Sequence, residues 1–116
     1  MKKRILLVED DSAVRRMLSR ILADEDYTVI PASDQREALK TAAAKGADLV
    51  VLDLSLPAHE SQEALNRFAQ EHPDLPVIVT TGSHHPPAVP GARSLMEKPL
   101  DFAKLLRTIQ SLLAPA

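Results

Sequence analysis

The sequence predicts a doubly wound α/β domain, in which helices cover both faces of a parallel β-sheet. Three observations support this prediction. Short apolar runs alternate with amphipathic helical patterns, several of these runs are apolar throughout, and acidic residues directly follow two of them. Uninterrupted apolar runs rich in branched side chains are typical of strands buried on both faces of a parallel sheet. The alternation of strands with helices is typical of doubly wound folds.

Composition excludes several classes of protein. The chain has 116 residues and no cysteine, so we expect one domain over residues 1–116 and exclude disulfide scaffolds and Cys-based metal sites. Its net charge is −2, and its sequence lacks the excess of basic residues that is typical of nucleic-acid-binding proteins. No apolar run approaches the roughly 20 residues of a membrane helix or the apolar region of a signal peptide. We therefore expect a cytoplasmic protein with no direct nucleic-acid or membrane partner.

Five short segments are expected to form the strands. The first and third are apolar throughout and lead into acidic residues. The second stops at Pro31, the fourth lies between Pro76 and Gly82, and the fifth stops at Lys98. The expected strands are Ile5–Val8, Thr28–Ile30, Leu49–Leu52, Val77–Thr81 and Ser94–Glu97.

Four stretches have apolar residues at helical spacing, and their flanking residues suggest where they begin and end. Ser12 is expected to cap the first helix and Asp101 the last. Asp34 with Glu37 resembles a capping box for the second helix, which should end near Gly46. The apolar stripes are Val14, Met17, Leu18, Ile21 and Leu22 in the first helix; Ala64, Leu65, Phe68 and Ala69 in the third; and Phe102, Leu105, Leu106, Ile109, Leu112 and Leu113 in the last.

A loop is expected where a further helix would complete the alternation. Residues 83–91, between the last two strands, contain Pro86, Pro87 and Pro90, and prolines so closely spaced exclude a regular helix interior. The histidines in and near this loop, His84 and His85 among them, are expected to be solvated side chains. Adjacent histidines do not both face one metal from a regular element.

Charged and polar side chains lie at the carboxyl ends of four of the expected strands. Glu9 and Asp10 follow the first strand and Asp53 the third, so three carboxylates meet if these strands are neighbours. Close carboxylates repel one another unless a cation lies between them, and Mg²⁺ suits such a small oxygen site. Thr81 and Lys98 add a hydroxyl and an ammonium at the same rim. The combination points to phosphoryl transfer, although any single acid of this kind is as often a solvated turn residue.

Four segments resemble those of CheY-like response regulator receiver domains: Ile5–Ser12, Asp53–Pro57, Val77–Gly82 and Lys98–Pro99. The resemblance covers essentially the whole chain. It implies a flavodoxin-like fold with five parallel strands in the order 2-1-3-4-5, and a role in two-component signalling.

The resemblance also implies a role for each acid at the site. Asp53 matches the aspartate that accepts a phosphoryl group from a sensor histidine kinase or a phosphotransfer protein. Asp10 matches a direct Mg²⁺ ligand and Glu9 one that acts through water. Asp53 and the backbone carbonyl of Ser55 complete the implied metal ligands.

Further residues match the switch region of the family, with departures. Thr81 matches the hydroxyl that moves onto the phosphoryl group, Lys98 the lysine that pairs with it, and Pro99 the proline after a cis peptide bond. Leu95 stands at the position of the switch aromatic residue, and Ser61 at a frequent glycine. Since leucine does not swing as an aromatic ring does, we expect signalling to order or disorder residues 83–93.

We therefore predict a phosphorylatable signalling module that catalyses only its own phosphorylation and dephosphorylation. Its output is expected in a downstream protein or an attached domain outside these residues. A homodimer through the last helix is an option, although the core already needs that helix's single apolar stripe. The alternatives are a phosphorylation-independent interaction or dimerisation module and a Mg²⁺-dependent phosphatase or phosphotransferase. The intact set of site residues argues against the first, and the lack of a second acid just after Asp53 against the second.

Overall fold

The computed structural model describes residues 2–54, 58–82 and 89–114, with the side chains of 35, 43–45 and 58–61 also outside the description. Strands and helices alternate as predicted, and the described residues between the last two strands, 89–93, are not helical. The elements are β1 (Arg4–Val8), α1 (Ser12–Asp24), β2 (Thr28–Ala32), α2 (Gln35–Lys45), β3 (Leu49–Asp53), α3 (Ala58–Glu71), β4 (Val77–Thr81), β5 (Ser94–Glu97) and α4 (Phe102–Leu113).

The strands form one parallel sheet in the order β2-β1-β3-β4-β5, which confirms the predicted topology. Leu7 lies opposite Val51, which in turn lies opposite Ile78. Because β1 and β3 are parallel neighbours in this register, the residues that follow them emerge at the same edge of the sheet.

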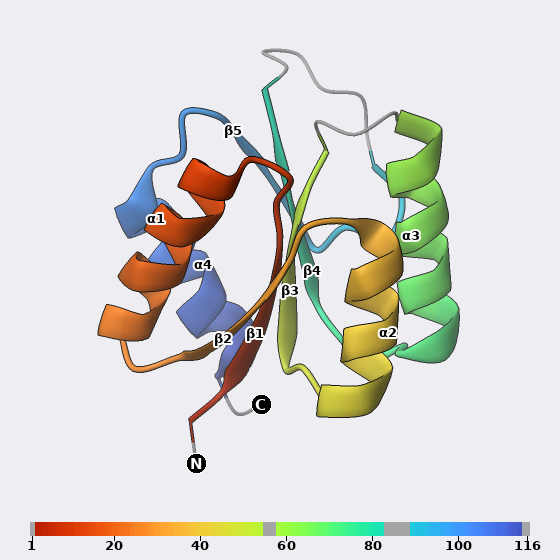
Figure 1. Cartoon of the computed structure of the whole chain (residues 1–116), viewed down its shortest axis with the longest axis horizontal. Helices are drawn as coiled ribbons and strands as arrows, with labels where there is room; N and C mark the ends of the chain where they lie inside the picture. The colour runs from red at the N-terminus through yellow and green to blue at the C-terminus, as the bar shows by residue number, and fades with distance from the viewer. Residues whose placement is uncertain (1, 55–57, 83–88, 115–116) are drawn as a thin grey trace.

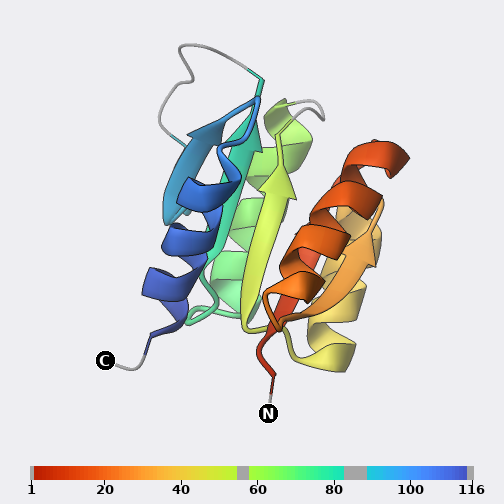
Figure 2. The same cartoon turned by 90° about the vertical axis from the view of Figure 1, so that its left-hand side faces the viewer.

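Alternate residues of the strands supply two separate hydrophobic cores. Leu6 and Val8 point into the core under α2 and α3, whereas Ile5 and Leu7 point into the core under α1 and α4. Figure 1 shows these two helix pairs on opposite faces of the sheet, and Figure 2 shows α1 and α4 side by side over one face. β1 and β3 are apolar without interruption because both of their faces are covered.

The helices bury most, but not all, of the residues in the predicted stripes. The buried members of the stripes are Leu18 and Leu22 in α1, Ala64, Leu65 and Phe68 in α3, and Leu105 and Ile109 in α4. Met17 is 46% exposed and Ala69 is also exposed, because both lie at the margin of their stripe, one position away from the core-facing direction. Within the described ranges, no helix is long and apolar enough to cross a membrane.

Side-chain carboxylates cap the helices whose start is described. Asp34 accepts a hydrogen bond from the Glu37 backbone at 2.8 Å, as the sequence predicts, and Asp101 caps α4. The cap of α1 is Asp11, not Ser12. Asp11 has the extended backbone of an N-cap residue and accepts from two amides of the first turn, while Ser12 already lies in the helix.

The prediction that β2 ends before Pro31 is wrong, because this strand continues to Ala32. β2 is an edge strand, and the Ala32 carbonyl accepts from the Glu9 amide of the neighbouring chain segment at 3.1 Å. Since backbone groups of successive residues point to opposite sides, those of Pro31 face the open edge. A missing N–H therefore costs the sheet no hydrogen bond there.

A short segment covers part of the sheet face where the sequence lacks a helix. Val89, Ala92 and Leu95 pack against the same core cluster as α2 and α3. Gln62 of α3 donates a hydrogen bond to the Pro90 carbonyl at 3.1 Å, which ties this segment to the helix. Residues 83–88, the rest of the predicted loop, lie outside the described residues.

The C-terminal end of α1 is held by a Schellman motif with an unusual residue at its centre. The Tyr27 amide donates to the Leu22 carbonyl and the Asp26 amide to the Ala23 carbonyl. Asp26 has φ 72°, in the left-handed region where glycine is preferred. Two further acids, Asp24 and Glu25, precede it at the negative end of the helix dipole.

Replacing Asp26 with glycine is expected to raise the free energy of unfolding by about 0.5–1 kcal/mol, because it removes both the left-handed strain and one unfavourable charge. The loss of the exposed ion pair with Lys2 costs little. Denaturant titration measures the change. Asp26→Asn serves as the control that removes the charge alone, and a glycine variant no more stable than this control would refute the role assigned to backbone strain.

Candidate functional site

Three carboxylates meet at the edge of the sheet where β1 and β3 end. One oxygen each from Glu9, Asp10 and Asp53 lies within 4.8 Å of the others. Glu9 and Asp53 are only 2% exposed, whereas Asp10 faces solvent. The parallel register of β1 and β3 brings these acids together, as expected from their positions in the sequence.

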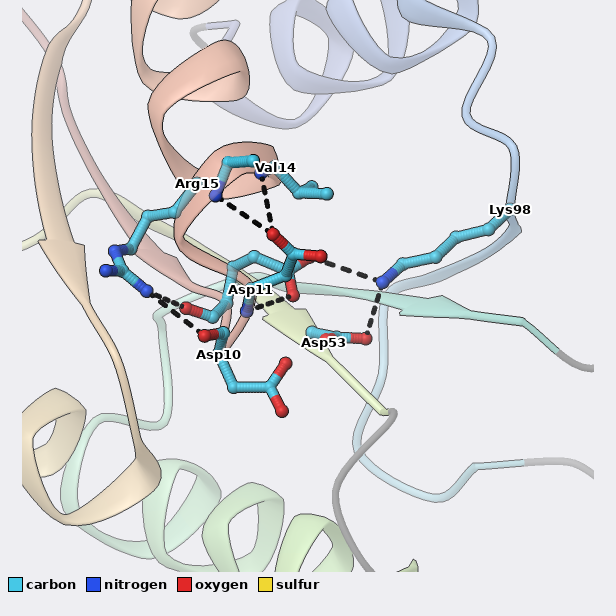
Figure 3. Close-up of polar contacts among 8 residues, drawn as sticks. Asp10, Asp11, Val14, Arg15, Asp53 and Lys98 are labelled. Carbon is cyan, nitrogen blue, oxygen red and sulfur yellow. Dashed lines mark hydrogen bonds and ion pairs between the residues drawn. The ribbon is translucent and has the colours of Figure 1, made fainter.

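Lys98 reaches this cluster from the segment that follows β5, at the opposite end of the sequence. Its Nζ lies 3.2 Å from Glu9 Oε1 and 3.0 Å from Asp53 Oδ1, so one ammonium group bridges the two buried carboxylates (Figure 3). The Lys98 side chain is half-buried. Such charge-assisted hydrogen bonds in a partly desolvated site are stronger than surface ion pairs.

The pKa values of the bridged groups reflect the imbalance of one cation against several carboxylates. Burial raises the pKa of the Glu9 carboxyl, and the hydrogen bond and negative charge of Asp53 raise it further, to about 7. Burial acts to lower the pKa of Lys98, but the hydrogen bond and charge of Asp53, together with those of Glu9, outweigh burial and raise it. The site thus holds excess negative charge and favours an additional cation.

The donors present fit Mg²⁺. They are hard carboxylate oxygens from the residues at the ends of two strands, and the exposure of Asp10 leaves room for coordinating water. Mg²⁺ prefers one or two carboxylates and keeps several waters, while Ca²⁺ takes six to eight oxygens. Ser55, whose backbone carbonyl the sequence suggests as a further ligand, lies outside the described residues.

Backbone hydrogen bonds hold the ends of β3, β4 and β5 beside one another. The Leu54 amide donates to the Thr80 carbonyl at 2.7 Å, and the Lys98 amide donates to the Thr81 carbonyl at 2.6 Å. Thr81 is buried at the last position of β4. Asp53, Thr81 and Lys98 therefore come from three neighbouring strand ends, which is the arrangement that their sequence positions imply.

Of the other residues that the sequence analysis singles out, Leu95, Pro99 and His72 lie within the described part of the chain. Leu95 is half-buried on β5 and packs against the core, and the Lys98–Pro99 peptide bond is cis. His72 is half-buried with its ring centroid 6.4 Å from that of Phe68, away from the carboxylates. The side chains of Ser61 and His59, and all of His84 and His85, lie outside the description.

Arg15 is a residue at this site that the sequence analysis does not predict. It lies in the first turn of α1, and its Nη1 donates to the Glu9 carbonyl at 2.7 Å (Figure 3). The available signal is an arginine five residues after Asp10, on a helix that starts directly after the acids. That spacing alone does not show that the guanidinium turns back toward the end of β1.

The family profile of the response regulator receiver domain matches residues 5–110. The response regulator MprA of Mycolicibacterium vanbaalenii is 36% identical over 118 residues, an overlap of 97% of this chain and 51% of the relative. MprA of Mycobacterium leprae is also 36% identical, over 95% of this chain and 50% of the relative. The chain thus spans about half the length of the curated relatives it matches.

Solved structures show the same architecture. The response regulator TrrA from Thermotoga maritima, crystallised with Mg²⁺ and BeF, has a TM-score of 0.87 and 29% identity, covering 96% of this chain and 99% of TrrA. A CheY-like receiver domain from Methanospirillum hungatei has the same TM-score and identity, covering 97% of this chain and 94% of that domain. TrrA in complex with the histidine kinase ThkA has a TM-score of 0.86 and 30% identity, with coverage of 97% and 99%.

In EDTA, the free energy of unfolding is expected to fall as the pH rises from about 5 to about 8. Glu9 has a pKa of about 7 in the folded state and of about 4.5 in the unfolded chain. Between these two pH values the folded state therefore binds more protons than the unfolded chain, and its stability falls as the pH rises. The expected fall is on the order of 2–3 kcal/mol. Denaturant titrations at several pH values measure it.

Glu9→Gln is the matched control, because it removes the titrating group and should flatten the profile. Saturating Mg²⁺ should flatten it too, since the cation favours the ionised carboxylates. If the wild-type profile is flat in EDTA, or equals that of Glu9→Gln, the raised pKa assigned to Glu9 is wrong.

Proposed function

Because this chain belongs to the response regulator receiver domain family, we propose that it accepts a phosphoryl group on Asp53, from a histidine kinase or a phosphotransfer protein, in a Mg²⁺-dependent reaction. One observation carries the proposal. The buried Asp53 carboxylate lies 3.0 Å from the Lys98 ammonium, beside two further carboxylates, the buried Glu9 and the exposed Asp10. This is the charge pattern of a phosphoryl-acceptor site.

Glu9, Asp10 and Asp53, with the Ser55 carbonyl, are the residues that would hold Mg²⁺. When bound, the cation supplies charge neutralisation between the carboxylates and the phosphoryl oxygens and orients them for in-line transfer. The Mg²⁺–BeF complex of the similar TrrA supports this assignment.

The chain's own groups divide the remaining work. An Asp53 carboxylate oxygen attacks phosphorus, and the bond between phosphorus and the donor nitrogen breaks as the Asp53–phosphorus bond forms. Lys98, already within hydrogen-bond distance of Asp53, pairs with a phosphoryl oxygen and offsets its charge. Thr81, on the neighbouring strand end, donates its hydroxyl to another phosphoryl oxygen.

Phosphorylation is proposed to act as a switch. Phosphorylation replaces the single negative charge of the Asp53 carboxylate with about −2 on the phosphoryl group, in a site that already holds excess carboxylate charge, and Thr81 and Lys98 respond by moving. With Leu95 in place of an aromatic ring, the response is proposed to act on residues 83–93. The structure of TrrA bound to the kinase ThkA supports a kinase partner. Three predictions from the sequence stay predictions. They are that the output lies in a downstream protein or an attached domain, that the protein is cytoplasmic, and that it can form a homodimer.

The first experiment is intact-mass spectrometry after incubation with acetyl phosphate, with and without Mg²⁺. We expect wild type to gain one phosphoryl group only with Mg²⁺, and Asp53→Asn to gain none, because its amide is not a nucleophile for this transfer. Asp48→Asn is the matched control: Asp48 precedes β3 at the opposite end of the strand and should not affect labelling.

The alternatives give different outcomes. Labelling that persists in Asp53→Asn would contradict the assigned acceptor. No gain from acetyl phosphate or a purified histidine kinase, despite Mg²⁺ binding, would favour the phosphorylation-independent interaction module. A small phosphate ester turned over without a covalent product on Asp53 would instead favour the phosphatase alternative.

A further inference from the structure

The turn between β1 and α1 carries two of the three carboxylates, and Arg15 contacts it from the side away from Lys98 (Figure 3). Its Nη1 donates to the Glu9 carbonyl at 2.7 Å, a short charge-assisted hydrogen bond, and lies 3.5 Å from the Asp10 carbonyl, at the limit of hydrogen bonding. Both contacts are to the backbone, so Arg15 acts on the direction of peptide groups and not on the carboxylates themselves.

Other hydrogen bonds hold this turn at its ends, and within it the Asp11 amide donates to Glu9 Oε2 at 3.3 Å, a longer bond than that from Arg15 to the Glu9 carbonyl. At the start, the Glu9 amide donates to the Ala32 carbonyl at 3.1 Å. At the end, Asp11 caps α1 through Ala13 at 2.9 Å. The peptide groups of Glu9 and Asp10 lie between these two anchors, and each peptide group is a rigid plane. Fixing the direction of these carbonyls therefore fixes the direction in which the Asp10 side chain leaves the backbone.

We propose that Arg15 is a positioning residue, which holds the β1–α1 turn so that Asp10 points toward Asp53 and shares a cation with it. Asp10 depends most on this support, because its side chain is exposed while the other two carboxylates are buried. The inference rests on the proposed Mg²⁺ site. Partners that orient metal ligands typically change metal affinity by about 10–100-fold when they are removed.

The charge of Arg15 and its effect on the turn predict opposite changes in Mg²⁺ affinity when the residue is replaced. The guanidinium repels a cation bound nearby, so removing its charge alone would tighten Mg²⁺ binding. Loss of the held turn would weaken Mg²⁺ binding, because the ligands would no longer be fixed in place. The sign of the change in affinity therefore separates the two roles of Arg15.

The test is isothermal titration of the metal-free protein with Mg²⁺, with Mn²⁺ binding followed by electron paramagnetic resonance as a second probe. We expect Arg15→Gln to weaken Mg²⁺ binding about tenfold. Arg15→Lys, which keeps the charge but offers a single ammonium in place of a planar fork, should recover part of the affinity, to within about threefold of wild type. The control is Arg16→Gln, which removes an equal, exposed charge one position along α1 and should change affinity by less than about twofold.

A denaturant titration in EDTA shows whether each variant is folded. The NMR chemical shifts of the Asp10 and Asp11 backbone amides show directly whether the conformation of the turn has changed. If Arg15→Gln does not fold, Arg15→Lys is used in its place, and its Mg²⁺ affinity should still be lower than that of wild type. Unchanged or tighter Mg²⁺ binding by the folded Arg15 variants, or an equal loss in Arg16→Gln, would overturn this inference alone. Wild-type protein that binds no Mg²⁺ would overturn the proposed function as well.

Discussion

One ammonium group holds two buried carboxylates together at the end of the sheet, and the geometry of the site depends on this interaction. Glu9 and Asp53 lie on neighbouring strand ends with almost no contact with water, where their charges would otherwise repel each other. Lys98 comes from a remote part of the sequence and reaches them only because β5 lies two strands from β3 in the same sheet. Fold and site are therefore inseparable: the strand order creates the repulsion and also delivers the cation that offsets it.

The sheet and the acids at its edge could be predicted because they depend on patterns along the chain. A run such as Leu49–Leu52 is apolar throughout since helices cover both sides of β3, and Asp53 is the last residue of this strand, at the sheet edge where β1 also ends. The extent of β2 beyond Pro31 could not be predicted in this way. Whether proline is tolerated depends on which strand lies at the edge, and strand order is a property of the tertiary structure.

Two other differences have the same origin in three-dimensional context. Asp11 and Ser12 are adjacent and both are good N-cap residues, so composition alone does not decide between them; the extended backbone at Asp11 does. Arg15 contributes a side-chain hydrogen bond to a carbonyl on a preceding turn, and no periodicity or motif marks such a contact. Features held by side chain-to-backbone contacts are thus the part of the site that sequence patterns reveal least.

The hydrogen bond from the Lys98 amide to the Thr81 carbonyl has a consequence for how the sheet edge moves. Thr81 and Lys98 belong to different strands, yet this bond joins their backbones immediately beside both side chains. The bond therefore couples the two strand ends: a displacement of either one that keeps the bond also displaces the other. We therefore expect Thr81 and Lys98 to move together while this bond is kept, and not as two independent hinges.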